Sequence, residues 1–430
     1  MIAWVRSDFP HPKLPAAMWT LNRIKQGTAN YPRQFWLLFW GLLINAAGTS
    51  IVWPFITIYM RRRLGVPLTS ITLLFTLNSA AGLAATSTAG PLVDRFGRKG
   101  AMVLSLVVAA ATLAAMSNAG TLAVWAVLQA LSGAAGPLYR VGNNAVVADL
   151  VEPQRRPAAY ALLRTISNLG VAIGPSVGGF ISGISYSLAF YIAAGASTLF
   201  ALLILCFVAE TAPRGHQGPN QPHQNRGYRP LLRDRPFLAF CAVYTLAGTA
   251  YSLMMVLLPV YAKENFGVAE NRYGFIMATN AGMVVMLQYT VTRVTDRYHH
   301  LPVLAIGSLF YAVGVGSVGW GWNFPTFLLS MILLTIGEMI MIPTSTALTA
   351  NLAPPDMRGR YMSVYGLTWG IGFGIGPVIG GFLNDNVAPV AIWYGGLVMG
   401  LAAALGFVLL ARARRAQVGL KKKGNVEPAR

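Results

Sequence analysis

The sequence predicts an all-α integral membrane protein with twelve transmembrane helices in two six-helix bundles, related by a parallel internal repeat. Three observations carry this prediction. The chain has 430 residues, of which 55% are hydrophobic and 11% are charged, whereas a soluble domain carries about a quarter charged residues. Twelve apolar runs are long enough to cross a bilayer, since about 20 residues suffice for a helix. The two halves of the chain also match each other at one constant offset.

The composition excludes several classes of protein. Single soluble cores stop growing at about 250–300 residues, so the bilayer is the natural solvent for this much apolar sequence. The two cysteines, Cys206 and Cys241, lie in apolar runs and offer neither a disulfide framework nor a metal pattern. All five histidines fall in predicted loops, so we expect no metal site. The first 33 residues contain no apolar core, and we therefore expect no cleavable signal peptide.

The apolar runs define the expected spans. Helices are the expected form because lipid cannot satisfy exposed backbone groups. The runs are 34–60, 68–93, 100–117, 121–148, 157–182, 187–209, 236–261, 272–295, 301–320, 325–351, 361–383 and 388–411. They divide the chain into an N-terminal tail (1–33), an N-terminal bundle (34–209), a polar central linker (210–235), a C-terminal bundle (236–411) and a basic C-terminal tail (412–430).

The basic residues predict the orientation. Of the 33 lysines and arginines, 26 fall in the two tails and in the loops on the same side of the predicted membrane. By the positive-inside rule, both termini are cytoplasmic and the chain lies in the cell (inner) membrane. The net charge of +20 therefore reflects topology and attraction to anionic lipids rather than nucleic-acid binding. The run Arg61–Arg63 on the opposite side is an exception that the sequence does not explain.

An offset of 202 residues aligns the two halves. Tyr59 then matches Tyr261, Asn78 matches Asn280, and the pair Asp94–Arg95 matches Asp296–Arg297. The repeat is parallel, because six spans return the chain to its starting side. Two six-helix halves related by an axis along the membrane normal are a known plan of secondary transporters, with the binding site between the halves near the midplane.

The loop between the second and third spans contains a recognisable motif. It reads Gly90-Pro91-Leu92-Val93-Asp94-Arg95-Phe96-Gly97-Arg98-Lys99, which resembles the GxLxDRxGRK signature of the major facilitator superfamily. The resemblance implies a conformational latch made of Gly90, Asp94, Arg95, Gly97, Arg98 and Lys99. The alternative is a topology signal in which the basic residues only fix orientation, which is at least as good a reading for Arg98 and Lys99.

Two glycine-rich segments occupy equivalent spans of the two halves. The segment in the fifth span resembles the motif of antiporters in this superfamily and suggests drug/proton antiport. Its copy in the eleventh span favours helix packing inherited with the duplication, because small residues let backbones touch and proline makes a hinge. The packing and hinge residues are Gly170, Gly174, Pro175, Gly178, Gly179, Gly372, Gly376, Pro377, Gly380 and Gly381.

Charges inside the predicted spans are the main candidates for function, because each is costly unless it is paired or faces water. Glu338, near the middle of the tenth span, is predicted to take up the coupling proton. Arg140 in the fourth span and Arg164 in the fifth are predicted to bind an anionic group or to act on Glu338. A permanent ion pair between the bundles, or an acid held by backbone and water, remains the alternative.

Other polar residues complete the predicted site. Asp149 closes the fourth span and resembles a carboxylate of several multidrug exporters, so it is a second candidate for proton coupling, although a solvated helix-end charge explains it equally well. Glu210, at the end of the sixth span, is interpreted as a helix-end charge. The predicted cavity also takes in Asn168, Asn45, Asn78, Asn280, Gln288 and Trp369.

These observations favour a proton-coupled exporter of small, largely apolar compounds. Gln129 stands where related antiporters carry arginine in the RxxxG motif, which weakens the drug-export reading. The rival is a symporter or exchanger of a polar or anionic metabolite, such as a sugar or organic acid. An enzyme is not expected, because the spans contain no nucleophile–base pair or clustered histidine site. We expect a small-molecule substrate, membrane lipids as partners, protons as the coupling ion without another cofactor, and function as a monomer.

Overall fold

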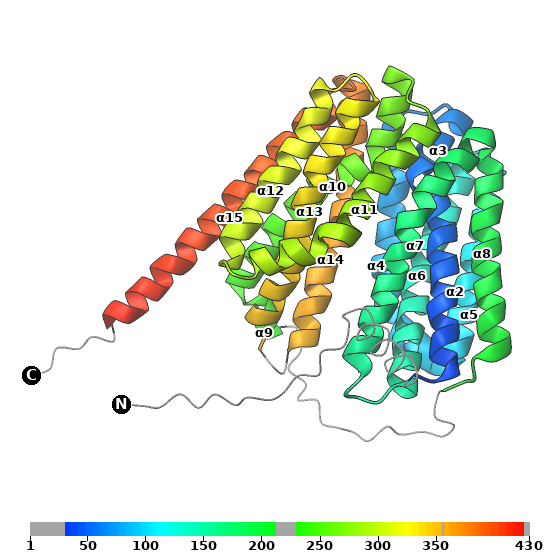
Figure 1. The fold of residues 1–430 in the computed structure, drawn as a ribbon, viewed down its shortest axis with the longest axis horizontal. Helices are drawn as coiled ribbons and strands as arrows, with labels where there is room; N and C mark the ends of the chain where they lie inside the picture. Colours follow the sequence, from blue (N-terminus) through cyan, green and yellow to red (C-terminus); the bar gives the residue numbers. More distant parts are fainter. Residues whose placement is uncertain (1–30, 212–228, 355–356, 425–430) are drawn as a thin grey trace, which may run out of the picture.

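The computed structural model describes residues 31–211, 229–354 and 357–424, and every regular element in these ranges is a helix (Figure 1). The N-terminal half contains α2 (Arg33–Val52), η1 (Trp53–Phe55), α3 (Ile56–Leu64), α4 (Leu68–Phe96), α5 (Arg98–Met116), α6 (Leu122–Leu150), α7 (Arg156–Ile184) and α8 (Tyr186–Phe207). The C-terminal half contains α9 (Arg229–Leu232), α10 (Arg235–Phe266), α11 (Glu270–Thr295), α12 (His300–Ser317), η2 (Val318–Trp320), α13 (Phe324–Leu352), α14 (Arg358–Asn386) and α15 (Ala391–Gly424).

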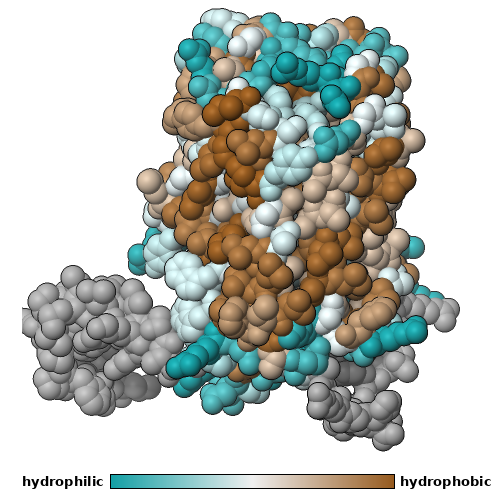
Figure 2. Space-filling model, turned by 90° about the vertical axis from the view of Figure 1, so that its right-hand side faces the viewer, coloured by the Kyte–Doolittle hydropathy of each residue, from teal (hydrophilic) through white to brown (hydrophobic). Residues whose placement is uncertain are grey.

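The long helices have the length and composition of membrane spans. Within the described ranges, eleven helices are long enough and hydrophobic enough to cross a membrane. The twelfth, α7, has 29 residues and packs against α2 of its own bundle and α11 of the other. Figure 2 shows hydrophobic residues over the middle of the visible face and hydrophilic residues at its two ends. The predicted fold of twelve helices in two bundles is therefore confirmed.

The duplication is visible in where the helices begin. The first residues of α2, α4, α5, α6 and α7 lie 202 positions before those of α10, α11, α12, α13 and α14. The helices α3 and α10 both end at a glycine in the left-handed conformation, Gly65 with φ of 62° and Gly267 with φ of 63°. Such a residue terminates a helix without the strain that a side chain would bring. The same local chemistry therefore stops the first span of each half.

Three details differ from the prediction. The last helix, α15, continues to Gly424, 13 residues beyond the expected span, because its apolar segment is followed by good helix formers. The short helix α9 lies inside the predicted linker. Pro54 interrupts the first span, which tightens into η1 between α2 and α3. Residues 1–30, 212–228, 355–356 and 425–430 lie outside the described residues. They include most of the predicted N-terminal tail and linker and the last six residues of the predicted C-terminal tail.

Both bundles are held together by glycines at the predicted positions. Gly170, Gly174 and Gly178 of α7 lie against the backbone of α2, where a Cβ would approach within 2.4–2.7 Å of the nearest atom. In the other half, a Cβ on Gly372 of α14 would lie 3.1 Å from the nearest atom of α10, and one on Gly376 would lie 2.1 Å from it. Small residues allow this approach because no side chain separates the two backbones. The fifth helix of each bundle is thus fixed to the first.

Candidate functional site

A cavity of about 410 Å³ lies between the two bundles. The N-terminal bundle contributes residues of α2, η1 and α7 to its wall, and the C-terminal bundle contributes residues of α10, α11, α13 and α14. Most of the lining is apolar or aromatic, and the residues are Thr49, Ser50, Trp53, Val171, Pro175, Tyr251, Met255, Met277, Asn280, Glu338 and Phe373. Glu338 is the charged member of this lining.

Glu338 is held by neutral groups. Its Oε2 accepts a hydrogen bond of 2.8 Å from the amide of Asn280, and that amide also donates to Thr335 Oγ1 at 2.9 Å. Tyr251 lines the same cavity as Glu338. No ion pair of Glu338 with a basic residue is recorded in the described ranges, so the structure does not contain the interbundle ion pair that the sequence left open.

The amide of Asn280 has a counterpart in the other half. Asn78, 202 residues earlier, donates to the backbone oxygen of Gln129 at 3.0 Å and to its side-chain oxygen at 3.2 Å. Both asparagines therefore join the second helix of a bundle to the fourth. In the N-terminal bundle the partner is a neutral amide, and in the C-terminal bundle it is Glu338. The two asparagines are equivalent positions of the repeat, but their partners are not, since Gln129 corresponds to Met331 and Glu338 to Gly136.

The other predicted polar residues have separate locations. The side-chain oxygen of Asn45 accepts a hydrogen bond of 2.8 Å from Ser197, and Gln288 donates to the backbone oxygen of Met339 at 3.0 Å. These two side chains join helices within a bundle. Trp369 packs against the rings of Tyr244, Tyr251 and Phe373, close to the cavity wall. Asn168 is exposed.

Arg140 and Arg164 are exposed side chains outside the lining of the cavity. No hydrogen bond or ion pair of either guanidinium is recorded within the described part of the chain. By the offset of 202 residues Glu338 corresponds to Gly136, one helical turn before Arg140, but this equivalence fixes only the depth and leaves the direction of the side chain open. The structure therefore does not bring these arginines together with Glu338.

The predicted latch segment, Gly90–Lys99, is bound to its own bundle. The carboxylate of Glu210 accepts hydrogen bonds from the backbone N–H groups of Arg98, at 3.1 Å, and Lys99, at 3.2 Å. It thereby satisfies two free donors at the start of α5. Gly97 has φ of 77°, and a Cβ there would lie 2.4 Å from the Glu210 carboxylate. Glu210, which was interpreted from the sequence as a helix-end charge, therefore caps the start of α5 within the latch segment.

Two charged residues of the latch segment, Arg98 and Asp94, have different surroundings. The guanidinium of Arg98 forms an ion pair with Asp149 at the end of α6. Asp149 is therefore paired, which the sequence reading of a solvated helix-end charge did not anticipate. Asp94 is exposed, and no partner for its carboxylate is recorded within the described ranges. In this conformation Asp94 leaves the opposite bundle unbound.

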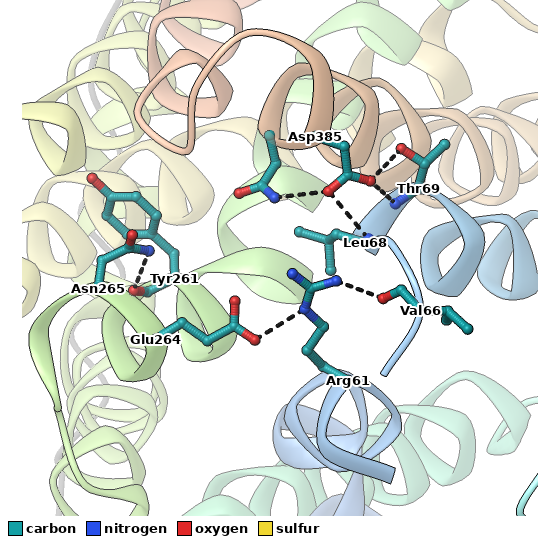
Figure 3. A network of polar contacts seen from close by, with 9 residues as sticks. Arg61, Val66, Leu68, Thr69, Tyr261, Glu264, Asn265 and Asp385 are labelled. Carbon is teal, nitrogen blue, oxygen red and sulfur yellow. Dashed lines mark hydrogen bonds and ion pairs between the residues drawn. The ribbon is translucent and has the colours of Figure 1, made fainter. Parts of the chain in front are cut away.

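The two ends of the helix bundle differ in which chain segments they carry. The end where α2 begins and α15 ends is the terminal face, and the opposite end, at the top of Figure 1, is the distal face. Four side-chain contacts close the distal face between the bundles (Figure 3). Asp385 of α14 accepts hydrogen bonds from the backbone N–H groups of Leu68, at 3.2 Å, and Thr69, at 2.7 Å, and from the Thr69 hydroxyl at 2.7 Å. Arg61 forms an ion pair of 3.1 Å with Glu264.

The contact of Asp385 is a helix cap supplied by the other bundle. Pro67 precedes α4 and has no side-chain hydrogen bond to its first turn, so the free N–H groups there need another acceptor. A second group of charges lies nearby, where Glu270 at the start of α11 accepts from Lys263 and from the hydroxyl of Tyr186 in the other bundle. Sequence reasoning missed these acids, because their partners in the opposite bundle are distant in the chain.

The last glycine of each motif faces across the interface. A Cβ on Gly179 of α7 would lie 2.6 Å from the backbone of Glu270, and one on Gly381 of α14 would lie 2.6 Å from the Thr72 hydroxyl. The other glycines of the motif pack within a bundle, as described above. The distal closure therefore combines close backbone contact with the hydrogen bonds of Figure 3, and the cavity lies on the terminal side of it.

The chain is similar to known transport proteins along most of its length. The model of the Major Facilitator Superfamily matches residues 38–264 and 240–429. Multidrug resistance protein MdtH of Shigella boydii is 27% identical over 85% of this chain and 89% of its own. A Na(+), Li(+), K(+)/H(+) antiporter of Planococcus maritimus is 26% identical over 84% of this chain and 91% of its own. The crystal structure of the nucleoside transporter NupG superposes with a TM-score of 0.74 at 14% identity, covering 88% of this chain and 99% of that one.

Proposed function

Because the chain belongs to the Major Facilitator Superfamily, we propose that it is a proton-coupled exporter of small, largely apolar compounds that works by alternating access. It is a multi-pass membrane transporter and not an enzyme. In proteins built from two such halves, one half rocks against the other around a site near the midplane.

The observation that carries the proposal is the lining of the interbundle cavity. Its apolar and aromatic side chains suit a largely apolar compound, because ligand sites are mostly hydrophobic with a few polar groups that fix orientation. Its charged member is the carboxylate of Glu338. A carboxylate with neutral neighbours in an apolar cavity is a group that a proton can neutralise, and one that favours a cationic substrate when it is ionised.

The coupling follows from competition at Glu338. When ionised, the carboxylate attracts a cationic compound, and when protonated it no longer does. Protonation shifts the balance between the two conformations only if the carboxylate meets different surroundings in each. Opening of the distal face separates the cavity walls, so the solvent exposure of Glu338 changes between the states. Proton entry can then drive substrate release on the distal side.

Two relatives support antiport in general terms. One carries the name of a multidrug resistance protein and the other that of a monovalent cation/proton antiporter. Both names come to this chain only as a proposal. The rival, symport or exchange of a polar or anionic metabolite, depends on Arg140 and Arg164, which are outside the cavity lining of this conformation. The apolar lining favours export of apolar compounds over this rival.

The orientation is part of the proposal. The basic residues of the described ranges lie mainly on the terminal face, which suggests that this face is cytoplasmic in the inner membrane. The distal closure then shuts the outer side, and the free carboxylate of Asp94 is available to bind the opposite bundle when the terminal face closes. The latch segment would in this way favour the outward-facing state.

Everted membrane vesicles test the proposal. A lipophilic fluorescent cation such as ethidium should be taken up when a proton gradient is imposed and should leave when the gradient is collapsed. The variant Glu338→Gln keeps the shape and removes the charge, so uptake should fall to the background of vesicles without the protein. Asp296→Asn, which neutralises an exposed acid far from the cavity, is the matched control and should behave as the wild type. Equal uptake by Glu338→Gln would exclude Glu338 as the coupling site.

A further inference from the structure

A second pocket, of about 410 Å³, opens at the distal face and is separate from the interbundle cavity. Its walls come from the ends of α3 and α7, the start of α8, and residues of α10 and α11. It is lined by three basic side chains, Arg62, Arg63 and Lys263, and by the acid Glu270. The lining is more polar than that of the cavity, and it draws on both bundles.

The charges of this pocket do not cancel. Lys263 is paired with Glu270, which also accepts a hydrogen bond from the Tyr186 hydroxyl. Arg62 and Arg63 are exposed, and no hydrogen bond or ion pair of either one is recorded in the described ranges. Two positive charges are therefore left over in a concave site, on the face of the molecule that carries few other basic residues.

A buried hydroxyl in the wall also lacks a partner. Ser182 is 3% exposed, and its Oγ has no hydrogen-bond partner among the residues that the structure describes. An unpaired buried polar group costs free energy, and such a group in a pocket wall calls for an explanation such as a ligand or an ion. Its neighbour Ser185 is the N-cap of α8, accepting from the N–H of Leu188 at 3.3 Å.

The internal repeat shows what this region lacks. The residue 202 positions before Asp385 is Gly183, which lines the pocket and has no other atom within 4 Å of a built Cβ. In one half of the molecule the carboxylate of Asp385 bridges the bundles at the distal face (Figure 3). In the other half the equivalent position has no side chain, and it shares the pocket with Arg62 and Arg63, which have no ion pair within the described part of the chain. An anion from outside the chain can supply the missing charge.

We propose that this distal pocket, lined by Arg62, Arg63 and Ser182, binds a phosphate-bearing anion and thereby stabilises the distal-closed conformation. Arginine presents paired N–H donors that match phosphate oxygens, and two guanidiniums balance a dianionic phosphate. Arg62, Arg63 and Ser182 belong to the N-terminal bundle, and the positive charge of Lys263 lines the same pocket from the C-terminal bundle. An anion that contacts both sides favours the conformation in which the bundles meet. The phosphate belongs either to a soluble compound or to the headgroup of an anionic phospholipid, which share this chemistry.

Thermal unfolding of the detergent-purified full chain tests the binding. Inorganic pyrophosphate should raise the unfolding temperature more than sodium chloride at equal ionic strength, because a bound ligand stabilises the native state. In the double variant Arg62→Gln/Arg63→Gln the dissociation constant should rise about tenfold for each lost charge-assisted contact. Arg272→Gln removes another basic residue near the start of α11 that does not line the pocket, and it should bind as the wild type.

Ser182→Ala separates the proposal from a purely structural role. Removing an unpaired buried hydroxyl should leave the ligand-free unfolding temperature unchanged or raise it, while it weakens pyrophosphate binding about threefold to tenfold. Nanodiscs of phosphatidylcholine with or without phosphatidylglycerol identify the source. A lipid headgroup predicts stabilisation by phosphatidylglycerol that depends on Arg62 and Arg63, whereas a soluble phosphate predicts stabilisation by pyrophosphate in both discs.

Two results would overturn the proposal. One is an equal response of the wild type and the arginine double variant to pyrophosphate and to phosphatidylglycerol. The other is a rise in the unfolding temperature on anion binding without a shift toward the distal-closed conformation. Spin labels at Gly120 and Val387, on exposed distal positions of the two bundles, report the distance between them, and the bound anion should shift the distribution toward the shorter distance.

Discussion

Replacing Asp385 by alanine should open the distal face. In the structure this carboxylate accepts three hydrogen bonds from the first turn of α4, two from backbone N–H groups and one from the Thr69 hydroxyl. Pro67 offers no side-chain cap there. The contact exists only while the bundles meet, so its loss acts on the conformational equilibrium and much less on the folding of either bundle.

The magnitude follows from the geometry. Loss of a helix N-cap costs about 0.5–2 kcal/mol, and the exposed setting of Asp385 lets water replace the bonds when they break. We expect a net change of about 1 kcal/mol, since a charge-assisted hydrogen bond in water is worth far less than in an apolar medium. The ratio of distal-closed to distal-open molecules should therefore fall about fivefold.

Distance measurements by electron spin resonance between labels at Gly120 and Val387 give this ratio in proteoliposomes. Asp385→Asn keeps an acceptor oxygen and should lie between the wild type and Asp385→Ala. The matched control is Asn386→Ala, because the Asn386 amide bonds only to the Phe382 carbonyl of its own helix among the described residues. If Asp385→Ala leaves the distance distribution unchanged, the cap across the interface does not hold the distal face closed.

Three further substitutions test the packing and the caps. Gly174→Leu should lower the free energy of unfolding by about 1–3 kcal/mol or prevent folding, since a Cβ there already lies 2.5 Å from α2. The control is Gly195→Ala, where no atom lies within 4 Å of a built Cβ, and its thermal unfolding should be nearly that of the wild type. Glu210→Gln should lower stability by about 1 kcal/mol, because it weakens the cap on α5, and an unchanged unfolding temperature would contradict that role. Arg61→Gln should change the distal equilibrium by less than about 1 kcal/mol, because its ion pair with Glu264 is partly exposed, and the effect should vanish in high salt.

The helices were predictable because each rests on local chemistry and on the repeat. Runs of apolar residues set the spans, and the offset of 202 residues places the start of α11 from that of α4 without further information. Gly65 and Gly267 terminate equivalent helices for the same backbone reason. The extension of α15 to Gly424 was not predictable from hydropathy, because the added turns are polar and depend on helix propensity alone.

Residues of the site could be predicted from the sequence only where a charged side chain lies in a membrane span, because burying such a charge costs free energy. Glu338 was a candidate because a charge in a span needs a reason, and the structure places it in a cavity beside Asn280. The contacts of Asp385 with Thr69 and of Arg61 with Glu264 join residues more than 200 positions apart. They depend on how the bundles meet, which neither composition nor periodicity encodes. In the sequence, the run Arg61–Arg63 on the predicted outer side was the feature that pointed to this region.

The central claim is that Glu338 couples proton movement to substrate export. Proteoliposomes holding the purified protein and a pH-sensitive dye measure proton movement directly when ethidium is added against an imposed gradient. The wild type and Asp296→Asn should move protons in step with ethidium, while Glu338→Gln, which lacks the charge that attracts the cation, should move no protons. Proton movement by Glu338→Gln equal to that of the wild type would contradict the claim.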